Sequence, residues 1–96
     1  MIRLSVLYPS GDDASFDMDY YRSSHMDIVR RTMKPSRIEI DEGQPGQPFV
    51  AASHLFFDSP EALQEAMGNP DTRETMADIP NFTNTQPQMQ VSTVIE

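Results

Sequence analysis

Two histidines, His25 and His54, are the only side chains of this sequence that ordinarily titrate near neutral pH, because the chain has no cysteine. A neutral imidazole can both accept and donate a proton. Two such rings beside one cavity would suit proton transfer on a carbon acid, a lactone or an enolisable ring. We expect His25 to be a general acid/base and His54 to be the second catalytic residue.

A helix predicted from about Met18 to Met33 positions His25. Asp17 is suited to cap its N-terminus, and Pro35 follows its C-terminus and ends it. At about 100° per residue, one side of the helix carries His25 near its middle. The residues that share this side are Met18, Tyr21, Ile28, Val29 and Thr32. A polar ring on such a face needs a partner or a ligand.

A strand predicted over residues 50–57 positions His54. Neither of its faces is polar, so both are expected to be covered. If His54 points toward the helices with Ala52 and Phe56, it borders the cavity beside the first helix, and Leu55 faces away from the helices. We predict a set of substrate-binding residues around that cavity. They are Tyr8, Tyr21, Met18, Val29, Ala52 and Phe56.

Other interpretations of these residues stay open. Each histidine could be a core residue that hydrogen-bonds a tyrosine or a backbone carbonyl, and the tyrosines could also be core. A metal site is not predicted, since His25 and Asp27 lie on different helix faces and no His-Glu-x-x-His spacing occurs. Haem ligation by His25 rests only on a histidine at an apolar face. Asp78 is either a turn residue, which is favoured, or a carboxylate near the pocket.

The remaining segments predict a ferredoxin-like α+β fold. Alternating apolar residues indicate further strands at residues 2–8, 37–41 and 89–95. A second helix is predicted to begin at Pro60, with Ser59 as its cap, and a short helical turn follows to about residue 78. The resulting order is that of a β-α-β-β-α-β sandwich, which forms a single domain over residues 1–96.

One face of that sheet has no helix to cover it. In a chain of 96 residues, the doubly apolar strand 50–57 has one ready cover for its far face, which is the same face of a second copy. We therefore predict a homodimer whose two sheets pack face to face, as in a dimeric α+β barrel.

Composition limits the other partners. Fifteen acidic residues against seven basic residues give a formal net charge of -8, which repels phosphate backbones and anionic lipid headgroups. No apolar run approaches the length of a membrane span, and no targeting segment is recognisable. We expect a soluble cytoplasmic protein that binds a hydrophobic small molecule, with no nucleic acid, membrane, metal or bound cofactor.

Several separated motifs resemble the EthD family, named for ethyl tert-butyl ether degradation. They are Val6-Leu7-Tyr8-Pro9, Phe16-Asp17, Tyr20-Tyr21-x-x-x-His25-Met26, His54-Leu55-Phe56-Phe57-Asp58-Ser59 and Ala77-Asp78-Ile79-Pro80-Asn81-Phe82-Thr83. The matches span most of the chain and leave residues 35–48 unmatched, and Asp27 stands where family members usually have proline. The resemblance implies a dimeric α+β barrel.

The same resemblance implies a range of activities. Among related barrels, methylmuconolactone isomerases resemble this chain in having histidines at positions like His25 and His54. Cofactor-free monooxygenases and polyketide cyclases are further relatives. Fold analogy alone does not choose among these reactions.

The favoured function is a small-molecule enzyme without a bound cofactor, an isomerase, cyclase or lyase acting on a hydrophobic cyclic or lactone-like catabolite. His25 is expected to act as the general acid/base, while His54 with Tyr8 or Tyr21 orients the substrate. One alternative is an accessory protein that holds a hydrophobic metabolite for an oxygenase. Another is a cofactor-free monooxygenase, which is disfavoured because the chain has no tryptophan and no evident oxygen-activating group.

Overall fold

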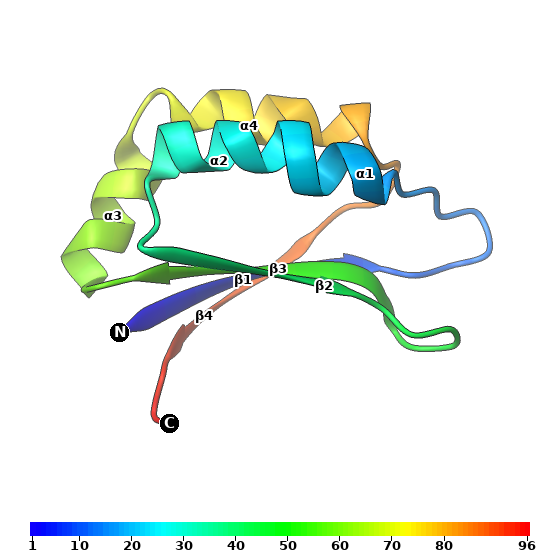
Figure 1. The fold of residues 1–96 in the computed structure, drawn as a ribbon, viewed down its shortest axis with the longest axis horizontal. Coiled ribbons are helices and arrows are strands. Elements are labelled where there is room, and N and C mark those ends of the chain that lie inside the picture. The colour runs from blue at the N-terminus through cyan, green and yellow to red at the C-terminus, as the bar shows by residue number, and fades with distance from the viewer.

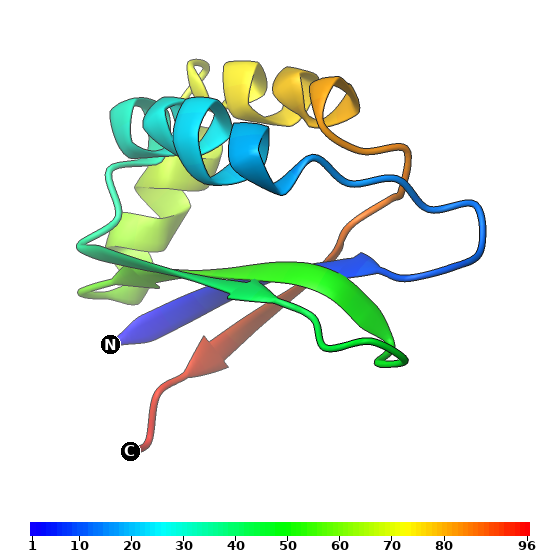
Figure 2. The same cartoon turned by 45° about the vertical axis from the view of Figure 1, so that its right-hand side comes forward.

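A computed structural model describes residues 1–96. The strands are β1 (Ile2–Pro9), β2 (Arg37–Glu42), β3 (Phe49–Phe57) and β4 (Gln88–Thr93). The helices are α1 (Met18–Tyr20), α2 (Met26–Met33), α3 (Pro60–Gly68) and α4 (Thr72–Asp78). The strands form one antiparallel sheet in the order β2-β3-β1-β4, and all helices lie on one of its faces (Figure 1, Figure 2). This arrangement confirms the predicted ferredoxin-like α+β sandwich. None of the helices is long and apolar enough to span a membrane.

The helix predicted over Met18–Met33 forms, but a π-helical turn over Tyr21–His25 separates α1 from α2. The Met26 N–H donates to the Tyr21 carbonyl, five residues back. A turn widened in this way sets residues four apart nearly in line. The rings of Tyr21 and His25 are stacked accordingly, with centroids 5.6 Å apart. The prediction of an unbroken helix was wrong on this point, because apolar periodicity does not distinguish the two bonding patterns.

Side-chain caps fix where two of the helices begin. The Asp17 carboxylate accepts a hydrogen bond from the Tyr20 N–H at 3.1 Å. Ser59 Oγ accepts one from the Ala62 N–H, also at 3.1 Å. Each bond satisfies a donor that the first helical turn leaves free. Both predicted caps are confirmed.

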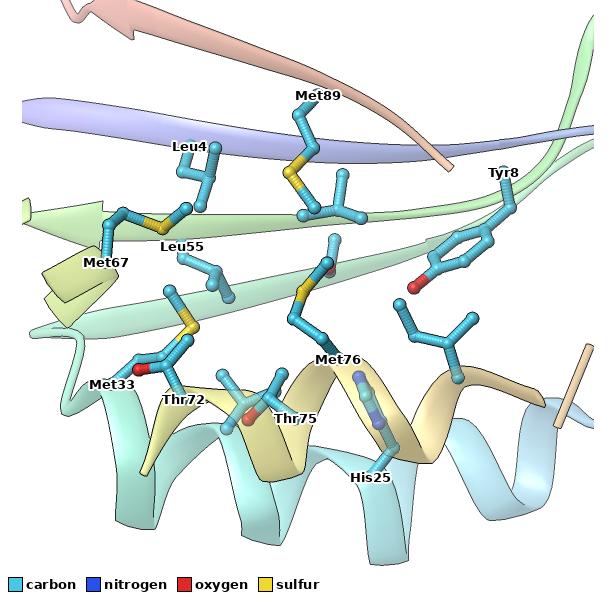
Figure 3. Close-up of a pocket in the computed structure, with 14 residues that line it drawn as sticks. Leu4, Tyr8, His25, Met33, Leu55, Met67, Thr72, Thr75, Met76 and Met89 are labelled. Carbon is cyan, nitrogen blue, oxygen red and sulfur yellow. The ribbon is translucent and has the colours of Figure 1, made fainter. Parts of the chain in front are cut away.

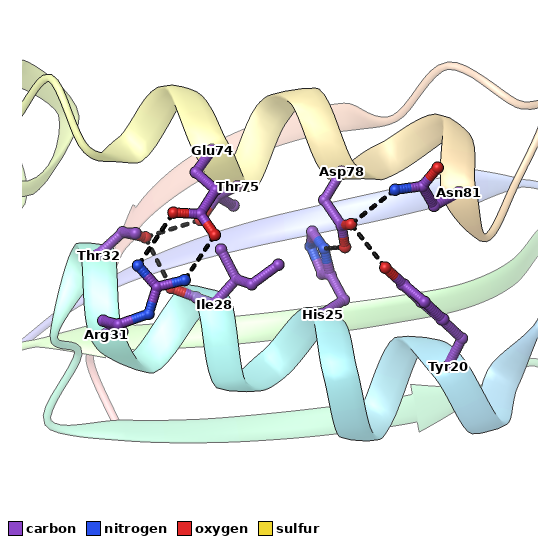
Figure 4. Close-up of polar contacts among 9 residues, drawn as sticks. All are labelled: Tyr20, His25, Ile28, Arg31, Thr32, Glu74, Thr75, Asp78 and Asn81. Atoms are coloured by element: carbon purple, nitrogen blue, oxygen red, sulfur yellow. Dashed lines mark hydrogen bonds and ion pairs between the residues drawn. The ribbon is translucent and has the colours of Figure 1, made fainter.

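Polar pairs join α2 to α4, which lie side by side above the sheet (Figure 1, Figure 4). The Arg31 guanidinium donates to both carboxylate oxygens of Glu74, with Nη1 and Oε1 2.9 Å apart. The hydroxyls of Thr32 and Thr75 are 2.7 Å apart and hydrogen-bonded. These pairs hold α4 against α2. They therefore place Asp78, the last residue of α4, beside the π-helical turn.

The register of the sheet decides which residues of β3 face the helices. Leu4 of β1 is paired with Leu55, and the next pair along is Ser5 with His54. Successive side chains point to opposite faces of a strand. Because Leu4 and Leu55 both belong to the helix-covered core, His54 lies on the open face of the sheet.

The predicted orientation of β3 was therefore wrong. Ala52, His54 and Phe56 face away from the helices, and Leu55 faces toward them. Both faces of β3 are largely apolar, so the sequence has no alternation that would fix which face is covered. A shift of one residue is enough to exchange the two faces.

The core between the helices and the sheet is aromatic at one end. Tyr8, Phe16, Tyr21 and Phe82 meet there, with ring centroids 4.9 to 5.6 Å apart and mostly edge-to-face contacts. The other end contains aliphatic and methionine side chains. The candidate site lies where these two parts meet.

Candidate active site

A buried histidine and a buried aspartate form the polar centre of the layer between the helices and the sheet (Figure 4). His25 is the last residue of the π-helical turn, and Asp78 is the last residue of α4. His25 Nδ1 and Asp78 Oδ2 are 2.9 Å apart, and the two residues are 3% and 7% exposed. The carboxylate accepts the Nδ1 proton, so Nε2 of the neutral ring is the acceptor. No group of the chain hydrogen-bonds Nε2.

Two further donors hold Asp78 in place. The Tyr20 hydroxyl donates to Oδ1 at 2.7 Å, and the Asn81 side-chain amide donates to the same oxygen at 2.9 Å. Burial by itself would raise the pKa of Asp78, but these bonds and the one from His25 lower it below its ordinary value. The carboxylate therefore stays ionised and fixes the orientation and tautomer of the ring.

The pKa of His25 is lowered from its ordinary value. Burial is the main cause, and the hydrogen bond and charge of Asp78 offset it only in part. The ring is consequently neutral at pH 7, and its free Nε2 can accept a proton. The imidazolium that results would be paired with the carboxylate of Asp78.

His25 borders a pocket between the sheet, α2, α3 and α4 (Figure 3). Most of the lining residues are hydrophobic, and no lysine, arginine, aspartate or glutamate is among them. Tyr8 and Ser53 also line the pocket and add two hydroxyl groups to its walls. The chemistry that this arrangement supports is proton transfer to or from an apolar molecule.

Methionines form the part of the pocket away from Tyr8 (Figure 3). Met67, Met76 and Met89 are each 41–48% exposed, so they stand where the pocket meets solvent. The cavity volume is about 30 Å³, which is room for roughly one or two waters. An organic substrate can therefore enter only if these flexible side chains move.

Part of the predicted site comes together in the structure. His25, Tyr8 and Val29 line the pocket. Tyr21 lies behind it, fully buried and stacked on His25. Met18 borders a separate surface hollow instead. The helix periodicity thus placed His25 correctly on the covered face.

His54 is absent from this pocket and has its own partners on the open face. Its Nδ1 is 2.8 Å from Ser5 Oγ, and its Nε2 is 2.9 Å from Asp41 Oδ2. Both ring nitrogens are therefore occupied. Ala52 and Phe56 lie on the same open face. The predicted cavity shared by the two histidines does not exist, because the register of β3 places them on opposite sides of the sheet.

Potential metal ligands meet only in pairs. No group of three or more histidine, aspartate or glutamate side chains converges on one point. His25 meets Asp78, and His54 meets Asp41. Each pair offers at most two side-chain ligands.

Asp78 is the residue of the candidate site that the sequence interpretation undervalued. The predicted turn does follow it, as a 3₁₀ turn over Ile79–Asn81, yet Asp78 also holds the histidine. Because 53 positions separate it from His25, no local pattern connects the two residues. The one available signal was its place in the motif of residues 77–83.

Comparisons with known proteins agree with this description. The profile of the EthD domain matches residues 10–86. The crystal structure of an EthD-like protein from Ralstonia eutropha is 30% identical with a TM-score of 0.86, covering 99% of this chain and 92% of that chain. An ethyl tert-butyl ether degradation (EthD) family protein from Bacillus halodurans is 18% identical with a TM-score of 0.78, covering 99% of each chain.

A more distant structure shares the fold. A dimeric protein of unknown function with a ferredoxin-like fold from Bacteroides fragilis is 12% identical with a TM-score of 0.62, covering 97% of this chain and 95% of that chain. No protein with a curated functional description matches the sequence.

Proposed function

This chain belongs to the EthD family, and from that premise we propose that it is an isomerase, cyclase or lyase acting on a hydrophobic cyclic or lactone-like metabolite. His25 acts as the general acid/base and needs no bound cofactor for this step. One observation carries the proposal: Nδ1 of His25 is bonded to Asp78, and Nε2 is unpaired in a residue that borders an apolar pocket.

The reaction begins when His25 Nε2 takes a proton from a carbon atom of the substrate. Burial favours the neutral ring before this step, and Asp78 pairs with the imidazolium after it. Return of the proton to a different carbon gives an isomerisation, and loss of a leaving group from the carbanion gives an elimination. A positioned base of this kind contributes typically about 10²–10⁴-fold in rate.

The test is a panel of muconolactones, aromatic polyketide intermediates and ether-degradation products. The wild-type protein should convert at least one of them, and His25→Gln should lower turnover about 10²–10⁴-fold with little change in affinity. Glutamine keeps most of the size and hydrogen bonding but takes no proton. His54→Gln is the matched control on the open face and should leave turnover unchanged.

The second candidate is an accessory protein that holds a hydrophobic metabolite for an oxygenase. The cavity of about 30 Å³ behind partly exposed methionines favours it, since a ligand that entered past these side chains would leave slowly. Binding of panel compounds without conversion would contradict the enzyme proposal and support this one.

We also propose that two copies pair through the open face of the sheet, which the helices leave bare (Figure 2). Arg3 and Arg37 flank Phe56 there, and the Arg37 guanidinium is 4.2 Å from the ring centroid. Glu39 and Asp41 follow along β2 on the same face. A two-fold arrangement can set the arginines of one copy against the carboxylates of the other. Arg3 Nε, which is buried without a partner, would then gain an acceptor. The dimeric protein from Bacteroides fragilis supports this assembly.

A further inference from the structure

Three hydroxyl groups gather near His25, and no polar group outside the three is hydrogen-bonded to any of them. Those of Tyr8 and Ser53 belong to residues that line the pocket. Tyr21 is fully buried, its hydroxyl is unpaired, and Ser53 and Tyr8 are the polar side chains beside it. Buried hydroxyls in proteins are normally bonded. A cluster of three hydroxyls with no acceptor outside itself therefore indicates a ligand with an oxygen acceptor.

Packing holds these side chains in fixed positions. Tyr8 is near the end of β1, and its ring meets Phe82 edge-on at 5.6 Å. Tyr21 begins the π-helical turn, and its ring is 5.4 Å from that of Tyr8 and stacked on His25. Ser53 lies within β3. Donors that are held in place before the reaction stabilise a developing negative charge most effectively.

The pocket offers donors next to a single free base. Burial raises the pKa of Tyr8 and of Tyr21 above the ordinary value, so both phenols stay protonated and can donate. His25 Nε2 is the acceptor beside them. A charged substrate would find no counter-ion, because no lysine, arginine, aspartate or glutamate lines the pocket. The complementary ligand is uncharged, with an oxygen acceptor near a hydrogen that His25 can remove.

We propose that Tyr8 and Ser53 form a subsite for the carbonyl oxygen of an uncharged, enolisable ketone or lactone, with Tyr21 as a positioning residue behind them. This inference rests on the proposed function. When His25 removes a proton from the carbon next to the carbonyl, the C–H bond breaks and its electron pair forms the double bond of an enolate. The negative charge moves to the carbonyl oxygen, where the two hydroxyls donate. Return of the same proton from His25 to carbon balances the step without an oxidant.

A nitrophenol tests this subsite while the substrate is unidentified. Its O–H proton mimics the substrate proton that His25 removes, and its phenolate oxygen mimics the oxygen of the enolate. We expect the wild-type protein to bind 4-nitrophenol as the phenolate, visible by absorbance, at a pH where the free compound is mostly protonated. Tyr8→Phe should lower the affinity for the phenolate about 10–100-fold. Tyr21→Phe should shift the absorption maximum of the bound phenolate, with a smaller loss of affinity.

Two controls separate loss of the hydroxyl from loss of the pocket. 4-Nitroanisole has the same ring without an ionisable proton, and Tyr8→Phe should bind it as the wild type does. Ser24→Ala removes an exposed hydroxyl of the same π-helical turn and should bind the phenolate as the wild type does. Binding of only the neutral phenol by the wild type, binding of neither form, or full phenolate affinity in Tyr8→Phe would each overturn the inference.

His25→Gln distinguishes the failure of this inference from the failure of the proposed function. Glutamine takes no proton, so His25→Gln should bind 4-nitrophenol only as the neutral phenol, through Tyr8 and Ser53. A wild-type protein that binds the phenolate but converts no carbon acid would contradict the enzyme proposal and leave the oxygen subsite in place.

Discussion

His25 and His54 each lie 2.9 Å from a carboxylate oxygen, but they occupy opposite faces of one sheet. The side chains of His25 and Asp78 are 4% and 7% exposed, whereas that of Asp41 is 61% exposed. Nε2 of His25 is unpaired beside a pocket, while Ser5 occupies the second nitrogen of His54. The same pair of residue types therefore gives a proton acceptor on one face and a closed polar network on the other.

The comparison shows that a histidine and an aspartate within bonding distance do not by themselves make a catalytic pair. In the single chain the Asp41 side chain is 61% exposed and solvent screens its charge, whereas burial under the helices strengthens the interaction between His25 and Asp78. A free ring nitrogen beside an apolar pocket is the second requirement, and only His25 meets it.

The largest expected difference between the two faces is in stability. Leu55→Lys places an ammonium group in the core, where Leu55 is 3% exposed. The free energy of unfolding should fall by about 4 kcal/mol or more. Ala52→Lys lies on the open face opposite Asp41, so it should keep the fold and give monomers. Circular dichroism and light scattering measure the two outcomes. A stable, folded Leu55→Lys protein would contradict the register, and a dimeric Ala52→Lys protein would contradict the proposed pairing.

The next difference is between the carboxylates of Asp78 and Asp41, in their expected effects on turnover and stability. Asp78→Asn should lower turnover about 10²–10⁴-fold, because an asparagine amide can donate to Nδ1 and so favour the wrong tautomer of His25. It should also lower the free energy of unfolding by about 1–3 kcal/mol. Asp41→Asn, at a side chain that is exposed in the single chain, should lower the free energy of unfolding less than Asp78→Asn does and leave turnover unchanged. Steady-state kinetics and urea denaturation test both, and equal effects of the two changes would remove the distinction between the faces.

The smallest expected difference is a dependence of stability on pH. His25 has a lowered pKa in the folded protein, while the unfolded chain keeps the ordinary value of 6.5. The unfolded state therefore binds more protons as the pH falls below 6.5, and the free energy of unfolding should decrease by up to about 1.4 kcal/mol per pH unit. Urea midpoints measured across this range should show a smaller slope in His25→Gln than in the wild type. The same slope in both proteins would exclude His25 as the responsible group.

Much of the fold could be predicted because its signals are local. Asp17 and Ser59 cap helices through bonds that span three residues, and alternating apolar residues are enough to identify the strands. The orientation of β3 could not be predicted, because apolar residues on both of its faces give no alternation. The π-helical turn could not be predicted either, since its solvent-facing residues are as polar as those of an α-helix.

The site was predictable only where it depends on one element. The apolar face of the first helix placed His25 between the helices and the sheet, as the structure confirms. Asp78 belongs to a distant segment, and its approach to His25 depends on how α4 packs against α2. No pattern in the sequence places Ser53 beside the pocket, because its position there depends on the register of β3 with β1.

The π-helical turn also sets a requirement on chain length. Bonding five residues back makes it equivalent to a single-residue insertion in a regular helix. Ser23 and Ser24 lie on its exposed side, so deletion of either would remove no core side chain. The deletion would return the turn to regular α-helical bonding, so the helical residues on either side would keep the faces they present. Tyr21 and His25 would then be three residues apart, about 60° from being in line around the helix axis, and their rings could no longer stack. Homologous chains shortened here by one residue should therefore keep the fold and lose this stacking.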